Sequence, residues 1–376
     1  MERTVKQLFF FVVLLSMAIA LSAQIRTAHY EIIVPEGTGD VYSSEMEQRF
    51  TEYNKVFRFD SSLLASPLKV RVFTDKNEYD SYVVSLVGST RPGAIYIHYR
   101  NPANRELVIH RGSSEEASIV PHQAFIQFLR AFITDPPPWL REGFAVYFNT
   151  LKYDRARGTL VYEENLNWLE TAKRSAINPE AVLQSGAVFP NIQAFSGAMV
   201  SFFMADKNGG YYRSLTDSFM VLSTGASTEE NVQLMYQRLT LFNPIADLTR
   251  DYNNYIAGKK TFTELVEEGQ RAYNAKNYSS AEESFRKAAE LRSNHYAPSY
   301  YLGLVAYENK KYNEAEDFYK KALDYGGEKA MIQYARGVNA AAAGKKAEAI
   351  AFLEEAAAAD SARYKARSDD LIRKLQ

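Results

Sequence analysis

A repeat of 34 residues in the last third of the chain constrains its fold more than any other feature. Gly269, Gly303 and Gly337 are each 34 residues apart. Tandem units of this length that recur in one register are stacked helix pairs. The glycine and one alanine let the two helices of a hairpin approach closely, and a bulky residue fills the space between them. A second alanine lets the next hairpin pack against the first. Three further sets keep the spacing: Ala281, Ala315 and Ala349; Ala288, Ala322 and Ala356; and Phe285, Tyr319 and Leu353.

This period and these residues resemble the tetratricopeptide repeat, in three copies over about Thr261 to Asp360. Ser299 and Gln333 depart from the family pattern, because they stand where a large side chain is usual in repeats two and three. The mixed-charge segment Ser361–Leu375 is expected to be a helix that caps the last repeat. We therefore predict an all-α tetratricopeptide superhelix over residues 261–360 and a capping helix over residues 361–376.

The resemblance also implies a groove lined by the first helix of each repeat, in which members of this family hold peptides or partner proteins. This lining is aromatic and apolar, without the Lys/Arg cluster that would clamp a terminal carboxylate. We therefore expect a protein or peptide partner with an apolar or extended segment. Packing of the same surface on the preceding domain or on the cap is the alternative. The lining residues carried over are Val266, Gln270, Tyr273, Tyr300, Leu304, Tyr307, Tyr334 and Val338.

Residues 24–258 have a mixed pattern that predicts an α+β domain, with a small sheet followed by a helical lobe. Val41–Val56 and Lys76–Leu86 have helical periodicity. After residue 113 almost everything is expected to be helical, apart from a hairpin at Lys152–Tyr162 with Gly158 at its turn. Four β-branched and aromatic runs are predicted strands: Tyr30–Val34, Leu68–Thr74, Ala94–Tyr99 and Glu106–His110.

Two predicted helices of this domain bear the residues with possible chemistry. The second contains Pro-x-Trp-Leu-x-Glu-Gly-x-Ala-x-Tyr at residues 137–147. This phrase resembles the glutamate helix of gluzincin metallopeptidases, particularly the peptidase MA-like families. In them an upstream helix bears His-Glu-x-x-His, and the glutamate of Glu-Gly is the third zinc ligand. Pro121 lies just before the matching stretch of the upstream helix, so that helix either begins there or is kinked.

In such a site two histidines at i and i+4 share one helical face and bind Zn²⁺ with the glutamate, leaving one position for water. The glutamate of the first motif takes the proton of that water. The resemblance matches His122 to the first histidine and Glu142 to the third ligand. The general base, however, is replaced by Gln123 and the second histidine by Ile126.

An amide cannot take the proton, and isoleucine offers no ligand. We therefore predict an inactive relative, a pseudopeptidase domain with no catalytic residue, no bound metal and no cofactor. A zinc metallopeptidase with a non-standard site is the alternative. A residual metal site that uses His122 and Glu142, completed by a partner or by His98, also stays open.

Composition excludes several kinds of partner and of chemistry. The chain has 376 residues, with 44 basic and 45 acidic side chains, five histidines and no cysteine. A formal charge of −1 gives no general electrostatic case for nucleic acid. The absence of cysteine excludes disulfides, thiol catalysis and the lipid anchor of a bacterial lipoprotein.

The first 23 residues are predicted to be a signal peptide. Arg3 and Lys6 precede the uncharged run Leu8–Leu21, which is followed by small residues. We expect cleavage after Ala23, with Ala18-Ile19-Ala20 as another possible site. An uncleaved anchor is the alternative, although the run is short for a membrane span. The mature protein is expected to be periplasmic or secreted, with no membrane anchor.

Overall fold

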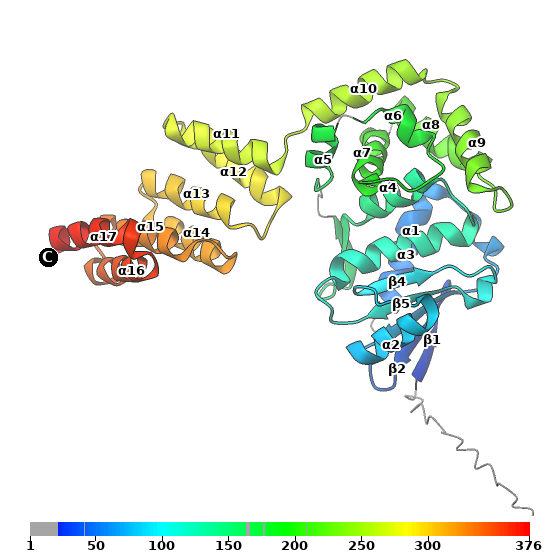
Figure 1. Ribbon diagram of the computed structural model, residues 1–376, viewed down its shortest axis with the longest axis horizontal. Helices are drawn as coiled ribbons and strands as arrows, with labels where there is room; N and C mark the ends of the chain where they lie inside the picture. The colour runs from blue at the N-terminus through cyan, green and yellow to red at the C-terminus, as the bar shows by residue number, and fades with distance from the viewer. Residues whose placement is uncertain (1–21, 41, 163–165, 176, 208) are drawn as a thin grey trace, which may run out of the picture. The chain divides into compact units, whose positions relative to one another are not determined.

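A computed structural model describes residues 22–40, 42–162, 166–175, 177–207 and 209–376 (Figure 1). Most of the predicted signal peptide, residues 1–21, lies outside the described residues. The contacts divide the chain into two units. The first unit runs to Thr134 and includes Leu151–Val161, and the second comprises Asp135–Thr150 and Tyr162–Gln376. None of the described helices is long and apolar enough to cross a lipid bilayer.

The first unit contains a five-stranded sheet with the order β1-β2-β3-β5-β4. The three central strands are parallel, and β1 and β4 run antiparallel to their neighbours at the two edges. The four predicted strands are all present, and β1 is additional. Because Ser22 and Ala23 begin β1, cleavage after Ala20 would keep this strand whole, whereas cleavage after Ala23 would shorten it. The strands are β1 (Ser22–Arg26), β2 (Tyr30–Pro35), β3 (Leu68–Phe73), β4 (Ala94–Ile97) and β5 (Glu106–His110).

Helices cover this sheet, with α1 and α3 on the same side and α2 apart from them (Figure 1). Tyr79 and Val83 of α2 pack against Ile97 and Val108 of the sheet. Between α1 and α3 the core is aromatic, and the rings of Phe50 and Phe128 meet edge to face at 5.2 Å. The helices are α1 (Ser43–Phe57), α2 (Lys76–Val87) and α3 (Glu116–Phe132), with short 3₁₀ turns at Ser61–Leu63 and Pro102–Asn104.

The predicted hairpin is present as β6 (Leu151–Asp154) and β7 (Thr159–Tyr162). Gly158 precedes β7 with φ +65°, a conformation that favours glycine at the turn. Gln48 of α1 holds this hairpin through both ends of its amide. Its Nε2 donates to the carbonyl of Gly158 at 2.8 Å, and its Oε1 accepts from the N–H of Leu160 at 3.1 Å. These two hydrogen bonds fix the hairpin to α1.

The second unit begins with a helical lobe. Its α4 and α7 pack closely because Gly143 has no side chain, since a Cβ there would lie 2.5 Å from the carbonyl oxygen of Ser196. Most side chains of the apolar run Phe195–Met204 in α7 are buried, so this run packs in the core of the lobe. The helices of the lobe are α4 (Pro138–Phe148), α5 (Leu169–Ser175), α6 (Pro179–Leu183), α7 (Ile192–Met204), α8 (Gly210–Ser218), the 3₁₀ turn Phe219–Val221, α9 (Thr228–Thr240) and α10 (Ile245–Gly258).

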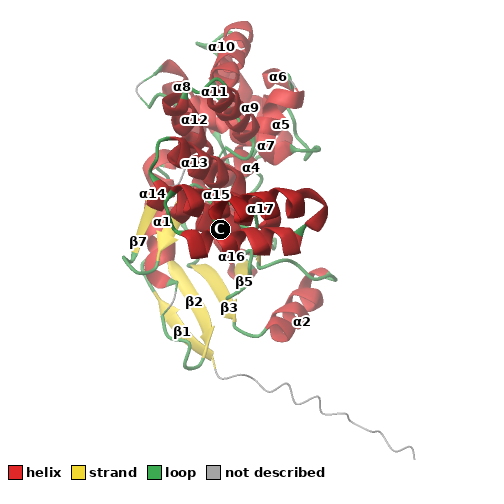
Figure 2. Ribbon diagram, turned by 90° about the vertical axis from the view of Figure 1, so that its left-hand side faces the viewer, coloured by secondary structure: helices red, strands yellow, loops and turns green. Residues whose placement is uncertain are grey.

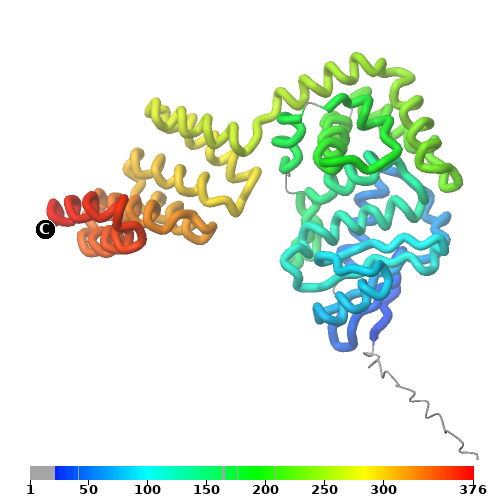
Figure 3. Tube along the Cα trace, viewed as in Figure 1, coloured from blue at the N-terminus to red at the C-terminus, as the bar shows by residue number. Residues whose placement is uncertain are grey.

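The remainder of the second unit consists of helices in succession (Figures 2 and 3). A Cβ on Gly269, Gly303 or Gly337 would lie 2.6, 2.4 or 2.7 Å from a side-chain atom of Phe285, Tyr319 or Leu353 respectively. The three hairpins thus make the glycine contact that the repeat predicts, and the array fits a tetratricopeptide superhelix. Its helices are α11 (Phe262–Asn274), α12 (Tyr278–Leu291), α13 (Tyr296–Glu308), α14 (Tyr312–Asp324), α15 (Lys329–Ala342), α16 (Lys346–Ala359) and α17 (Ser361–Leu375).

Gln333, which departs from the repeat pattern, is buried in a polar network within the third repeat. Its Nε2 donates to Glu355 at 2.5 Å, and its Oε1 accepts from Arg336 at 2.9 Å. Arg336 in turn pairs with Glu316 of the preceding hairpin. Hydrogen bonds across three helices therefore replace the apolar contact that a large side chain would make at this position.

Candidate functional site

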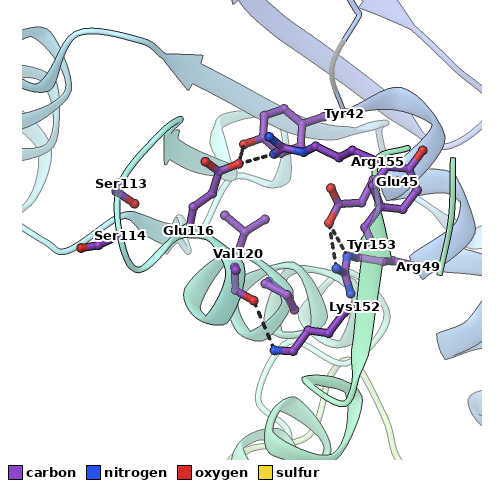
Figure 4. Close-up of a pocket in the computed structure, with 12 residues that line it drawn as sticks. Tyr42, Glu45, Arg49, Ser113, Ser114, Glu116, Val120, Lys152, Tyr153 and Arg155 are labelled. Atoms are coloured by element: carbon purple, nitrogen blue, oxygen red, sulfur yellow. Dashed lines mark hydrogen bonds and ion pairs between the residues drawn. The ribbon is translucent and has the colours of Figure 1, made fainter. Parts of the chain in front are cut away.

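The predicted motif helix, α3, begins five residues before Pro121 and continues through it. Proline has no N–H, so the carbonyl of Ala117, four residues earlier, has no helical donor. Lys152 of β6 supplies one, because its Nζ donates to the oxygen of Ala117 at 3.4 Å (Figure 4). The structure thus excludes a helix start at Pro121. The carbonyl that the proline leaves without a helical donor is bonded instead by a side chain from the hairpin.

A cavity of about 240 Å³ lies at this turn, within the first unit. Figure 4 shows carboxylate and cationic side chains around it, from α1, from the start of α3 and from the hairpin. No spacing in the sequence indicates this cluster, since its members come from three separate segments. The lining residues are Tyr42, Glu45, Arg49, Ser113, Ser114, Glu116, Ala117, Val120, Pro121, Lys152, Tyr153 and Arg155.

One side of the cavity is a buried ion pair on α1. Glu45 is 6% exposed and Arg49 only 1%. The Nε and Nη2 atoms of Arg49 both donate to Oε1 of Glu45, at 2.9 and 2.7 Å, and its Nη1 donates to the carbonyl of Leu151 at 3.0 Å. These three bonds offset the desolvation of the guanidinium and tie α1 to the hairpin.

The other side is centred on Glu116, the first residue of α3. Its carboxylate accepts bonds from the hydroxyl of Tyr42 at 2.5 Å and from the N–H of Gly112 at 2.6 Å, and it pairs with Arg155. Burial alone would raise the pKa of Glu116, but these hydrogen bonds outweigh it and hold the pKa below its usual value. Burial raises the pKa of the Tyr42 phenol, and its bond to Glu116 adds to this. Tyr42 is therefore a neutral donor at physiological pH.

The general-base position of the predicted motif has a structural contact. Oε1 of Gln123 accepts a hydrogen bond of 2.9 Å from the N–H of Tyr96 in the edge strand β4. The side chain of Gln123 thus pairs with a backbone donor that no further strand satisfies. His122 and Ile126, the other motif positions on α3, are half-buried.

Glu142, the remaining motif position, lies on α4 in the second unit and is buried, whereas His122 belongs to the first unit. Oε1 of Glu142 accepts from Nε of Arg141 at 2.8 Å, and its Oε2 lies 3.4 Å from Nε2 of Gln193. Within the described ranges, no three His, Cys, Asp or Glu side chains are grouped so that they could hold a metal ion.

The predicted lining residues of the repeats all lie on the first helix of a hairpin. Each of the eight is half-buried, neither fully enclosed in the core nor fully exposed. Val266, Gln270 and Tyr273 lie on α11, Tyr300, Leu304 and Tyr307 on α13, and Tyr334 and Val338 on α15.

Tyrosines form the most continuous part of this lining. Burial raises the pKa of Tyr300 to about 12, with smaller effects of the neighbouring phenols of Tyr301 and Tyr364. The ring of Tyr300 lies 6.2 Å from that of Tyr319 on α14. Tyr364, on the capping helix α17, packs against Tyr334 with 5.3 Å between the ring centres. At Tyr334 the predicted lining is thus in contact with the cap, and the sequence did not indicate this contact of Tyr364.

No protein-family model matches the chain, and no curated protein matches it. Among solved structures, it is similar to the tetratricopeptide domain of Arabidopsis OM64, with 17% identity and a TM-score of 0.29 over 31% of this chain and 93% of that one. It is also similar to residues 41 to the end of MamA from Desulfovibrio magneticus RS-1, with 20% identity and a TM-score of 0.27 over 37% of this chain and 85% of that one. Because the sequence identities and TM-scores are low, the repeat assignment rests on the helix contacts within the chain.

Proposed function

We propose that the protein is an exported, non-catalytic scaffold that binds a partner protein or peptide through its repeats. The observation that carries this proposal is the lining of α11, α13 and α15, where eight aromatic, apolar or amide side chains are half-buried in one register of the repeat. Side chains that pack against the core on one face and are accessible on the other can bind a partner with little loss of side-chain entropy.

In this proposal residues 24–258 are a pseudopeptidase domain of the peptidase MA-like type. The contact of Gln123 with Tyr96 supports it, because the side chain at the general-base position accepts a hydrogen bond from the backbone of the edge strand. Ile126 supports it as well, because it is apolar at a ligand position. This domain would present the repeats and contribute shape rather than catalysis.

Capture of a partner tests the role of the repeats. Wild type and the double variant Tyr300→Ala/Tyr334→Ala are compared for specific co-purification from the native envelope fraction, after cross-linking. We expect the double variant to lose the cross-linked partner. Undiminished capture by the variant, or by a chain without residues 261–376, would show that the repeats only brace the rest of the protein.

Measurements of zinc content and proteolysis test separately whether the protein is non-catalytic. We expect the purified chain to carry no stoichiometric zinc and to cleave no peptide. Stoichiometric zinc, together with cleavage that Glu142→Ala abolishes, would establish the zinc-peptidase alternative instead. This measurement is independent of partner capture, because Glu142 lies outside the repeats.

A further inference from the structure

We propose that the partner segment is proline-rich, adopts the polyproline II conformation and carries a basic residue. The inference rests on the proposed function and specifies the chemistry of the partner. It concerns the tyrosine surface, which we define as Tyr273, Tyr300, Tyr307 and Tyr334 on α11, α13 and α15.

The tyrosines repeat with the hairpins. Tyr273 and Tyr307 are 34 residues apart, as are Tyr300 and Tyr334, so each pair occupies one position in successive repeats. Packed helices lie about 8–10 Å apart. A polyproline II helix has three residues per turn and advances about 9 Å in that turn. Prolines three residues apart would therefore meet both tyrosines of one pair, on two successive first helices.

Tyr273 donates to Glu308 and the ring of Tyr334 packs against Tyr364 of the capping helix, but three hydroxyl groups of this surface have no protein partner in the described part of the chain. Those of Tyr300, Tyr307 and Tyr334 have no hydrogen-bond partner among the residues that the structure describes, although all three side chains are half-buried. The backbone carbonyls of a polyproline II segment make no internal hydrogen bonds and need external donors. Phenol groups supply those donors, and their rings supply a face for the proline.

The tyrosines are also held in place before any ligand arrives. The ring of Tyr300 has two aromatic neighbours, Tyr301 at 5.3 Å and Tyr319 at 6.2 Å. Tyr273 is fixed by its hydroxyl, which donates to Glu308 at 3.3 Å. Little side-chain entropy remains to be lost, and a proline-rich segment is itself restricted, so both partners enter with a small ordering cost.

The charge beside the tyrosines favours a basic residue in the ligand. Glu308 is exposed and accepts from the hydroxyls of Tyr273 and Tyr278, but no Lys or Arg pairs with it within the described ranges. Arg336 on α15 is already neutralised by Glu316, at 2.5 Å. The carboxylate of Glu308 is thus an open negative charge that bonds directly to a tyrosine of the surface, and it complements a Lys or Arg of the partner.

Titration of the purified full chain with synthetic peptides tests the inference. The probe is a peptide of about twelve residues with proline at every third position and one arginine. One control peptide has alanine for each proline, and another has glutamate for the arginine. We expect measurable binding of the probe, loss with the alanine peptide, and weaker binding of the glutamate peptide.

Matched variants locate the contact. Tyr300→Phe and Tyr334→Phe keep the rings and should each weaken binding of the probe about three- to tenfold, the value of one hydrogen bond. Glu308→Gln should remove the preference for arginine over glutamate in the peptide. Tyr162→Phe, at a 66% exposed tyrosine outside the repeats, should change neither result.

The outcomes separate this inference from the proposed function. Equal binding of the proline and alanine peptides, or no binding of the probe, overturns the inference. The proposed function then survives if Tyr300→Ala/Tyr334→Ala still abolishes capture of the native partner. If those substitutions affect neither the probe nor the partner, both proposals are wrong.

Discussion

The ammonium group of Lys152 donates a hydrogen bond to the carbonyl oxygen of Ala117, the acceptor that Pro121 leaves without a helical donor. A proline in a helix interior costs about 3 kcal/mol or more when nothing compensates for it. Here the hairpin supplies a donor, and the hydroxyl of Tyr53 lies 3.3 Å from the carbonyl of Pro121 itself. The turn next to His122 is therefore stabilised by its surroundings.

Lys152→Met should destabilise α3 through the loss of this bond, by about 0.5–1.5 kcal/mol. The cost should be smaller in a Pro121→Ala background, because that substitution restores a backbone N–H that can donate to the carbonyl of Ala117. We expect the two substitutions to couple by about 0.5–1 kcal/mol in a double-mutant cycle. Hydrogen exchange of the α3 amides in the four proteins measures this coupling. An equal cost of Lys152→Met in both backgrounds would mean that Lys152 stabilises something other than the opened turn.

Gln123→Ala should loosen the edge of the sheet, because the N–H of Tyr96 loses its acceptor at a cost of about 1–3 kcal/mol. Gln123→Glu keeps an oxygen at the same place and should cost less. The readout is the exchange rate of the Tyr96 amide, which should rise in the alanine variant and change little in the glutamate variant. Gln123→Glu should also produce no peptidase activity, since it restores the base but not the ligand missing at Ile126. Proteolysis by this variant would contradict the proposed loss of function.

Stability should fall at acid pH in part through Glu116. Its pKa is lower in the folded protein than its ordinary value of 4.5, so between the two values the unfolded chain binds more protons than the folded one. The stabilisation is thus present above pH 4.5 and is lost as the pH falls through the folded pKa. Urea unfolding followed by far-UV circular dichroism should show a weaker decline in acid for Glu116→Gln than for wild type. Glu115→Gln, at the exposed neighbouring position, is the control and should follow wild type.

The sequence was informative where a pattern is local or periodic. The 34-residue register of Gly303 and Tyr319 predicts a contact within one hairpin, because the spacing of two packed helices fixes which residues meet. A run of β-branched and aromatic residues predicts the strand at Leu68–Thr74 to within one residue. Strand β1 was missed because its first residues have the composition of a cleavage region. The cavity beside Pro121 was missed because Arg49, Glu116 and Lys152 meet only through tertiary packing.

Gly303→Ala should destabilise the repeats even though alanine is the better helix former by about 1 kcal/mol. A Cβ at this position would lie 2.4 Å from Cε1 of Tyr319, whose side chain is 1% exposed and has no open space into which to move. Overpacking of this kind costs about 1–3 kcal/mol, so it should outweigh the gain in propensity. The matched control is Gly258→Ala at the end of α10, where no atom lies within 4 Å of the new Cβ. Hydrogen exchange should quicken in α13 and α14 for Gly303→Ala, whereas Gly258→Ala should leave those helices unchanged. Slower exchange in α13 with Gly303→Ala would show that the hairpin has room for a side chain, and that the glycine is not what lets its two helices approach.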